Sequence, residues 1–251
     1  MADNTVDPSF QGKVALVTGA GKGIGRAIAV KLAELGAKVI GISRTQEDLD
    51  KLREQVPSIE TRLVDISDWD KTRQVVKDLG PIDMLVNNAG ITNWTGFLDV
   101  TKEELDSLHD INFKAAFNIS QVVAQGMTAR GTSGAMVNIS SVAGQRVVPN
   151  HTCYCTAKAA LDMLTMTLAF ELGPKKIRVN SVNPTIVLTE LGKIGWSDPV
   201  KKAGALAKIP IGRLGEEEDI VNATVFLLSD KSSMINGAIL PVDGGMIVSC
   251  V

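Results

Sequence analysis

The chain has few of the residues that build disulfide frameworks, metal sites and aromatic clusters. Its 251 residues include three cysteines, two histidines, three tryptophans and one tyrosine. Three cysteines without a paired framework argue against a disulfide scaffold and favour a reducing compartment. One residue separates Cys153 from Cys155, which is too close for a usual zinc spacing. The other candidates supply no suitably spaced ligands: His109, His151 and Cys250. We therefore predict no metal site and expect Cys153 and Cys155 to be buried thiols that pack as small hydrophobes.

Long apolar runs and a strong charge of either sign are also missing. No apolar run reaches the ~18 residues of a membrane-spanning helix. The formal net charge of −2, with no long basic run, gives no electrostatic reason to expect a nucleic-acid partner. The opening MADNTVDPSF is polar and acidic, and the closing IVSCV matches no common targeting signal. We therefore expect a cytoplasmic protein with no membrane span.

Short apolar segments alternate with helical patterns along the whole chain. Strands are expected at residues 13–18, 38–43, 61–64, 82–86, 135–139, 177–182 and 238–242. Helices are expected at residues 25–35, 45–55, 69–79, within 102–130, at 154–172 and at 219–228. This alternation is typical of an α/β fold with one parallel sheet and helices on both faces, and right-handed crossovers make that sheet doubly wound. We predict a single Rossmann-type domain over residues 1–251 with about seven strands.

Local signals mark where several of these elements begin and end. Gly36 stands where a glycine ends the first helix. Thr45 and Asp48 have the spacing of a capping box at the start of the second helix. The acidic run 216–219 predicts the N-terminus of the last helix, where the helix dipole favours negative charge. Residues 184–214 are rich in glycine, proline and lysine, and we expect them to form an irregular lid over a binding site.

The glycine-rich stretch TGAGKGIG lies between the first strand and the first helix. It fits neither the G-x-G-x-x-G fingerprint nor the P-loop pattern, because its spacing is T-G-x-x-x-G-x-G on Gly19, Gly23 and Gly25. Glycines allow a tight turn and close approach of the backbone to a pyrophosphate, and the helix that follows directs its N-terminus at the anion. A plain tight turn is the alternative, but the flanking strand and helix favour a dinucleotide site.

The end of the second strand indicates which dinucleotide is bound. NAD-binding folds place an acidic residue there to hold the ribose hydroxyls. This chain instead has Arg44 followed by Thr45, and Lys22 lies inside the glycine loop. An arginine suits a 2′-phosphate through paired, charge-assisted hydrogen bonds. We therefore predict NADPH/NADP+ as the cofactor; a solvated surface arginine is the alternative reading of Arg44.

Several motifs together resemble the short-chain dehydrogenase/reductase family. They are TGxxxGxG, the tetrapeptide NNAG at residues 87–90, Ser141 thirteen residues before Tyr154, and Tyr154-x-x-x-Lys158. The PVDGG segment at residues 241–245 is similar to that family too, so the resemblance covers nearly the whole chain. The strings VTGAGKGIGR, SRTQEDLD, ALDMLT, ELGPKKIRVN, VNPT and WSDP resemble one of its subgroups, the dicarbonyl/L-xylulose reductases.

The tyrosine and lysine of this motif have a direct chemical use. Four residues apart on a helix, Tyr154 and Lys158 share one face. A phenol has a pKa near 10, and a neighbouring ammonium stabilises the phenolate, so we expect the pKa of Tyr154 to be lowered. A tuned tyrosine acts as general acid in reduction and general base in oxidation. The alternative is a helix tyrosine that covers the core beside a lysine that extends to water.

The resemblance implies roles for further residues. It makes Asn112, Ser141, Tyr154 and Lys158 catalytic, with Ser141 steadying the substrate oxygen and Asn112 holding a water in a proton relay. It implies that the cofactor is bound by Gly19, Lys22, Gly23, Ile24, Gly25, Arg44, Thr45, Asp65, Asn88, Gly90, Tyr154, Lys158, Ile186, Val187 and Thr189. It places on the substrate side Ser141, Val148, Asn150, His151, Tyr154 and Trp196. For His151, a capping or surface histidine is an equal alternative.

These expectations combine into a predicted activity. The chain would reduce small carbonyl compounds with NADPH, such as α-dicarbonyls like diacetyl, or L-xylulose to xylitol, with the reverse oxidation also open. The resemblance implies a homotetramer. One alternative is another short-chain activity on a 3-oxoacyl or steroid substrate. The other is a non-catalytic NADP-binding protein, which the presence of Ser141, Tyr154 and Lys158 disfavours.

Overall fold

One parallel sheet of seven strands forms the centre of the molecule. The computed structural model describes residues 7–189 and 197–249, and the strand order is β3-β2-β1-β4-β5-β6-β7. The strands are β1 (Val14–Thr18), β2 (Lys38–Ser43), β3 (Glu60–Leu63), β4 (Met84–Asn87), β5 (Gly134–Ile139), β6 (Ile177–Pro184) and β7 (Ile239–Val242). Every neighbouring pair is parallel, which confirms the predicted doubly wound α/β class.

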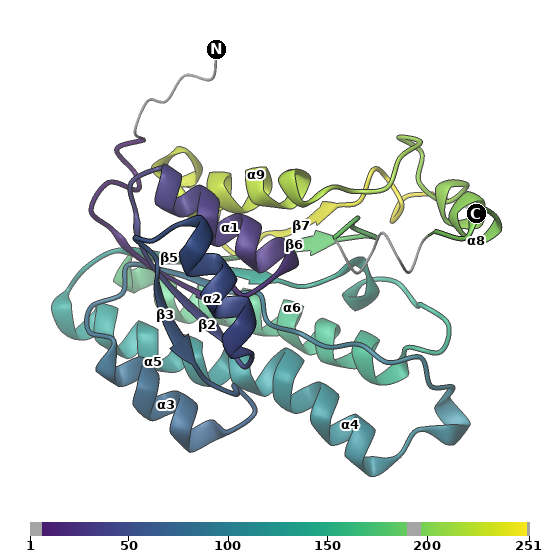
Figure 1. The fold of residues 1–251 in the computed structure, drawn as a ribbon, viewed down its shortest axis with the longest axis horizontal. Helices are drawn as coiled ribbons and strands as arrows, with labels where there is room; N and C mark the ends of the chain where they lie inside the picture. Colours follow the sequence, from purple (N-terminus) through teal and green to yellow (C-terminus); the bar gives the residue numbers. More distant parts are fainter. Residues whose placement is uncertain (1–6, 190–196, 250–251) are drawn as a thin grey trace.

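Helices cover both faces of the sheet (Figure 1). They are α1 (Gly23–Glu34), α2 (Gln46–Gln55), α3 (Trp69–Asp78), α4 (Lys102–His109), α5 (Ala115–Arg130), α6 (Thr152–Leu172), α8 (Pro199–Leu206) and α9 (Glu217–Leu228). Successive strand residues enter opposite cores because side chains alternate across a strand. Val17 of β1 packs in the core shared by α1, α2 and α9, whereas its neighbour Leu16 packs in the core shared by α3, α5 and α6.

The strand order reverses between β1 and β4, which lie side by side at the centre of the sheet. The chain leaves β1 toward the β2 side, and after β4 it continues toward β5. In open parallel sheets, this reversal opens a crevice at the carboxyl ends of the two strands, and ligands bind there. The glycine loop follows β1 and the NNAG segment follows β4, so the topology brings both motifs to this crevice.

The ends of the helices agree with the sequence in two places and differ in one. Gly36, at a φ of 95°, ends α1, and its N–H donates to the carbonyl of Ala33. Glu216 and Asp219 form a capping box at the start of α9. The predicted capping box of Thr45 and Asp48 is wrong, because Thr45 is the N-cap of α2 but its side chain makes no capping hydrogen bond.

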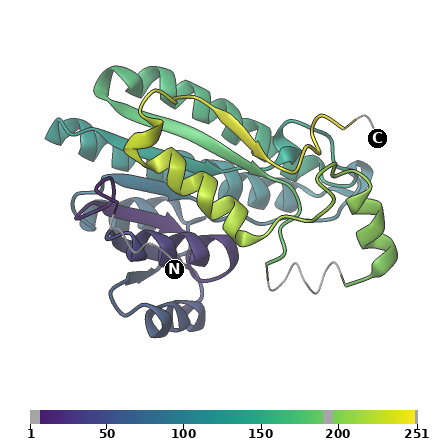
Figure 2. The same ribbon diagram turned by 90° about the horizontal axis from the view of Figure 1, so that it is seen from above.

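The expected irregular lid contains a helix that the sequence pattern did not predict. α8 lies inside residues 184–214, and Ile186, Ile209 and Met246 share one apolar cluster with side chains of this region. Figure 2 shows α8 and the C-terminal segment together at the end of the sheet where β6 and β7 finish. The sequence pattern did not predict α8, because the helix is short and its apolar residues lie among prolines and glycines.

Two further observations concern the described part of the chain as a whole. Across residues 7–189 and 197–249, no helix is long and apolar enough to cross a membrane. Over the same ranges, no three histidine, cysteine, aspartate or glutamate side chains are grouped so that they could hold a metal ion.

Candidate active site

The glycine loop needs glycine at the predicted positions. Gly19 and Gly23 have positive φ angles of 65° and 56°, a region that other residues rarely adopt. Gly25 leaves no room for a side chain, because a Cβ atom there would collide with the carbonyl oxygen of Gly19 and the side chain of Asn88. The bare backbone of this loop, followed by the N-terminus of α1, fits a pyrophosphate.

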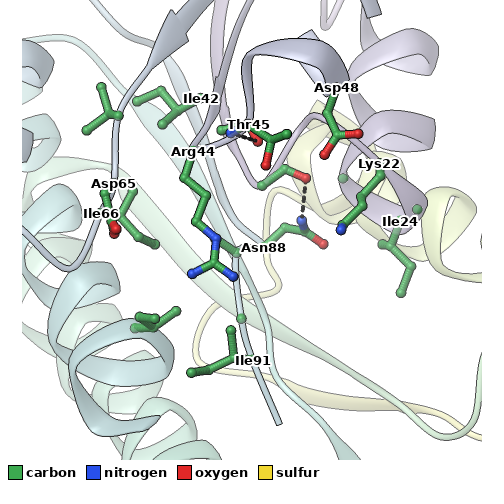
Figure 3. A pocket seen from close by; sticks show the side chains of 18 of the residues that line it. Lys22, Ile24, Ile42, Arg44, Thr45, Asp48, Asp65, Ile66, Asn88 and Ile91 are labelled. Carbon is green, nitrogen blue, oxygen red and sulfur yellow. Dashed lines mark hydrogen bonds between the residues drawn. The ribbon is translucent and has the colours of Figure 1, made fainter. Parts of the chain in front are cut away.

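A cavity of roughly 350 Å³ lies beside this loop (Figure 3). Its lining combines the glycine loop, the end of β2 and the NNAG segment. The predicted cofactor residues in this lining are Gly19, Lys22, Gly23, Ile24, Gly25, Arg44, Thr45, Asp65, Asn88, Gly90 and Thr189. Ile42, Val64 and Ile91 add apolar walls that the sequence reasoning did not single out. An elongated, partly apolar cleft with an anion-binding loop matches an adenine dinucleotide.

Two cations face this cavity from different elements. Figure 3 shows Arg44, from the end of β2, and Lys22, from the glycine loop, extending toward the same space. Among the described residues, neither side chain makes a hydrogen bond or ion pair. Asp65 is engaged instead by Ser67, whose backbone N–H and hydroxyl both donate to it and hold the pKa of the Asp65 carboxyl below its ordinary value. The side chains of Arg44 and Lys22 can therefore both donate hydrogen bonds to a 2′-phosphate.

Asn88 joins the two loops that form the crevice. Its side-chain amide donates to the carbonyl oxygens of Thr18 at 2.9 Å and Gly19 at 3.3 Å. Its backbone N–H donates to the hydroxyl of Thr18 at 3.0 Å. Asn88 therefore lines the cavity, as predicted, and also fixes the glycine loop to the NNAG segment.

A second cavity of roughly 410 Å³ continues from the first and contains the Tyr–Lys pair. Its lining shares Ile24, Asn88, Gly90, Ile91 and Thr189 with the first cavity and adds Asn112, Ser141, Tyr154, Lys158 and Val187. The Nζ atom of Lys158 lies 5.6 Å from the centroid of the Tyr154 ring, so both residues share one face of α6 as expected. The ammonium donates to the carbonyl of Ile139 at 2.9 Å.

The titration of this pair differs from the prediction. Burial raises the pKa of Tyr154 above its ordinary value, and a hydrogen bond from Ser141 opposes this only partly. Burial also lowers the pKa of Lys158 to about 8, while the charge of Asp162 raises it. The expected lowering of the Tyr154 pKa is therefore wrong for the protein alone, because removal of the phenolate from water outweighs the hydrogen bond from Ser141. At neutral pH the pair is a phenol beside an ammonium.

Asn112 is held by a short π-helical segment, Asp110–Lys114, between α4 and α5. Its carboxamide oxygen accepts from the N–H of Ile91 at 3.1 Å, and its amide donates to the carbonyl of Ile91 at 2.9 Å. π-helical turns are frequent at functional sites because they widen the helix locally. A Cβ atom at Gly90 would lie 2.7 Å from the Asn112 oxygen, so a glycine allows this close approach.

The predicted substrate side contains one aromatic contact that sequence reasoning missed. His151 is 6% exposed, and its Nδ1 donates to the carbonyl of Pro149 at 2.7 Å, so Nε2 is the acceptor of the ring. The ring of Trp94 meets His151 edge-on at 4.3 Å, and His151 lies 6.2 Å from the ring of Tyr154. Trp94 comes from the loop after NNAG and is 65% exposed. Its only sequence signal is an aromatic residue in a polar loop.

The remaining predicted residues lie outside the lining of the two cavities or outside the described residues. Val148 and Asn150 belong to the turn before His151, and none of these three residues lines the second cavity. The side chain of Ile186 packs into the apolar cluster near α8 instead of lining the cleft. The predicted substrate residue Trp196 lies outside the described residues. Cys153 is a buried free thiol, and Cys155 is a partly buried one, which fits the packing role expected for them.

Comparisons with known proteins agree with this geometry. A family model described as enoyl-(acyl carrier protein) reductase matches residues 19–247. The chain is 52% identical to D-erythrulose reductase of Gallus gallus, over 97% of this chain and 99% of that one. It is 52% identical to L-xylulose reductase of Homo sapiens, over 93% of this chain and 96% of that one. A gluconate 5-dehydrogenase structure from Burkholderia cenocepacia J2315, in complex with NADP and tartrate, superposes with a TM-score of 0.90 at 31% identity, covering 96% of this chain and 98% of that one.

The fold and the paired cavities define a dinucleotide-dependent oxidoreductase of the doubly wound class. The chain belongs to the short-chain dehydrogenase/reductase family. It is an oxidoreductase that interconverts hydroxyl and carbonyl groups, with NADP(H) as its cofactor. These findings confirm the predicted family, enzyme class and cofactor.

Proposed function

We propose that the protein reduces L-xylulose and small α-dicarbonyls such as diacetyl with NADPH, and that Tyr154 is the general acid. The observation that carries this proposal is the cavity in which Ser141, Tyr154 and Lys158 meet beside the dinucleotide cleft. The relatives named for L-xylulose and D-erythrulose reduction support small polar keto-sugars as the substrate class.

The proposed chemistry divides between the cofactor and the chain. Bound NADPH supplies a hydride to the carbonyl carbon. The hydroxyl of Tyr154 donates its proton to the carbonyl oxygen, and a raised pKa keeps that proton available at neutral pH. Ser141, which hydrogen-bonds Tyr154, steadies the same oxygen as negative charge develops. The buried ammonium of Lys158 stabilises the phenolate that remains, and Asn112, which lines the same cavity, would hold a water in the proton relay.

The substrate wall follows from the aromatic contact at His151. We propose that the Nε2 atom of His151 accepts a hydrogen bond from a substrate hydroxyl, because Nδ1 already donates to Pro149. The indole of Trp94 closes the same side and covers His151 from solvent. An aromatic face with one polar atom suits a short hydroxylated chain better than a bulky steroid.

We propose a homotetramer on the basis of apolar side chains that remain exposed. Phe170 is 86% exposed and Met163 is 59% exposed, and both lie on the outer side of α6. Phe117 of α5 is 38% exposed and stacks on Trp69, which is 40% exposed. Contiguous apolar patches of this kind mark association surfaces. Within the part of the chain that the structure describes, Cys153 and Cys155 are free thiols, which supports a reducing, cytoplasmic location.

The test is the rate of NADPH and NADH oxidation by the purified protein with diacetyl and with L-xylulose. We expect turnover of both carbonyls with NADPH and a much slower rate with NADH. Tight NADPH binding without turnover of either carbonyl would contradict the proposed substrates and favour the non-catalytic alternative. Turnover of a 3-oxoacyl thioester or a steroid alone would favour the other short-chain activities.

A further inference from the structure

A buried carboxyl group lies behind the catalytic residues, and the proposed chemistry does not use it. Asp162 is on α6, one turn beyond Lys158, and is 6% exposed. Carboxylates are rarely buried unless hydrogen bonds or opposite charges compensate for the loss of water. The buried carboxyl of Asp162 therefore needs hydrogen-bond donors close to it.

Two side chains of β6 contact this carboxyl: the Ser181 hydroxyl, at 3.3 Å, and the amide of Asn183, which is fully buried. The Nδ2 atom of Asn183 donates to the carboxyl of Asp162 at 2.9 Å and to the backbone carbonyl of Ser141 at 3.0 Å. An amide nitrogen has two hydrogens, so both are used. The hydroxyl of Ser181 donates to the Asn183 oxygen at 2.6 Å and fixes the other end of the amide. Asn183 thus bridges Asp162 to the residue that faces the substrate.

A second contact places the same carboxyl directly under the Ser141 segment. A Cβ atom added at Gly144 would lie 2.6 Å from a carboxyl oxygen of Asp162. The segment Val142–Gly144 is a short 3-10 turn, and the side chain of Ser141 caps it by accepting from the N–H of Ala143 at 3.1 Å. The turn that orients the Ser141 hydroxyl therefore rests on Asp162 at one end and on Asn183 at the other.

We propose that Asp162 is a positioning residue that acts through Asn183: it holds the Ser141 backbone where the Ser141 hydroxyl reaches the substrate oxygen. The inference rests on the role proposed for Ser141. The hydrogen bond to the Asp162 carboxyl, together with the one from Ser181, keeps the Asn183 amide in one orientation. Without the carboxyl, the amide loses one acceptor and the turn loses its support. A misplacement of about 1 Å at such a group can cost up to about 100-fold in rate.

The first test compares three variants by steady-state kinetics with the carbonyl that the wild type reduces fastest. We expect Asp162→Ala and Asn183→Ala each to lower kcat by roughly 10-fold to 100-fold, with an unchanged Kd for NADPH. Asp162→Asn keeps an oxygen acceptor for Asn183, so we expect it to retain most of the activity. Thr165→Val is the matched control, because Thr165 is also buried on α6 and hydrogen-bonded, but its direct partners are Asn138 and Leu161 and not Asp162, Asn183 or Ser141. Asn183→Ala tests the same bridge from β6 if Asp162→Ala does not fold.

The decisive test repeats Asp162→Ala in a Ser141→Ala background by single-turnover kinetics. If Asp162 acts through the Ser141 hydroxyl, its loss costs little once that hydroxyl is gone. An equal loss in both backgrounds, or a loss matched by Thr165→Val, would show a merely structural role and overturn the inference. If Ser141→Ala lowers kcat but Asp162→Ala does not, the inference fails and the proposed function stands. If Ser141→Ala does not lower kcat, the role of Ser141 fails and the inference with it.

Discussion

At the residue scale, the site depends on two buried groups whose pKa values burial moves in opposite directions. The pKa of Tyr154 is raised and that of Lys158 is lowered, so burial favours the neutral form of each side chain. A phenol that keeps its proton is suited to donate it to a carbonyl oxygen. In the reverse reaction Tyr154 must first be deprotonated, because the phenolate is the base that takes the proton of the alcohol. The positive charge of bound NADP+ would favour that phenolate.

The first prediction at this scale concerns the proton donor. We expect Tyr154→Phe to lower kcat for carbonyl reduction by at least roughly 100-fold, because the variant keeps the ring but has no proton to donate. NADPH binding, measured by fluorescence titration, should stay close to that of the wild type. Turnover that survives the substitution would contradict the general-acid role.

The second prediction concerns the pH dependence of stability. Because the pKa of Lys158 falls from 10.5 to about 8 on folding, the unfolded chain binds more protons between these two pH values. The free energy of unfolding should therefore rise with pH across that window, by about 2 kcal/mol from about pH 7 to about pH 9.5. Urea unfolding of the wild type and of Lys158→Met at both pH values isolates this contribution. A difference between the two proteins that does not change with pH would contradict the lowered pKa.

The third prediction concerns cofactor choice. Arg44 faces the cavity without an ion pair among the described residues, so its charge is available to a phosphate. We expect Arg44→Asp to weaken NADPH binding by roughly 100-fold or more, since the new carboxylate repels the 2′-phosphate. NADH binding should change little or improve. Equal weakening of both cofactors would contradict the contact with the 2′-phosphate.

At the element scale, the junction between β1 and α1 leaves no room for a side chain beside the cofactor cavity. Any side chain at Gly25 would meet the Gly19 carbonyl, which is backbone and cannot move without distorting the loop. We therefore expect Gly25→Ala to abolish detectable NADPH binding by isothermal titration calorimetry. The matched control is Gly126→Ala, since a Cβ atom there would contact only the end of the Arg130 side chain, at 3.4 Å. Normal binding by Gly25→Ala would contradict this role of the loop.

At the scale of the whole molecule, the apolar outer side of α6 predicts association. Phe170 is 86% exposed on a helix that packs its other side against the sheet. We expect Phe170→Glu to shift the assembly toward smaller species, because a carboxylate placed in a subunit contact is costly to desolvate. Size-exclusion chromatography with light scattering measures this shift, and Glu171→Gln, which removes a charge next to it, is the control. An unchanged mass for Phe170→Glu would exclude this side from the interface.

Much of the fold and of the site could be read from the sequence, because short-range patterns encode them. Strand and helix periodicity is local, and the glycine spacing, Arg44 and the Tyr154–Lys158 pair are visible along the chain. The helix α8 was not visible, because its short pattern lies among glycines and prolines. Trp94 was also not visible, since its contact with His151 joins residues far apart in the sequence.

By itself, the sequence determined the class of the sheet and the position of the glycine loop, and it pointed to Tyr154 as the proposed proton donor, because each depends on neighbours a few residues apart. Only the tertiary structure decided the ionisation of the site. The raised pKa of Tyr154 and the lowered pKa of Lys158 come from burial by distant elements. The bridge from Asp162 through Asn183 to Ser141 likewise joins α6, β6 and the turn after β5. Desolvation and hydrogen bonds across the fold act only after the chain has packed, so no local pattern contains them.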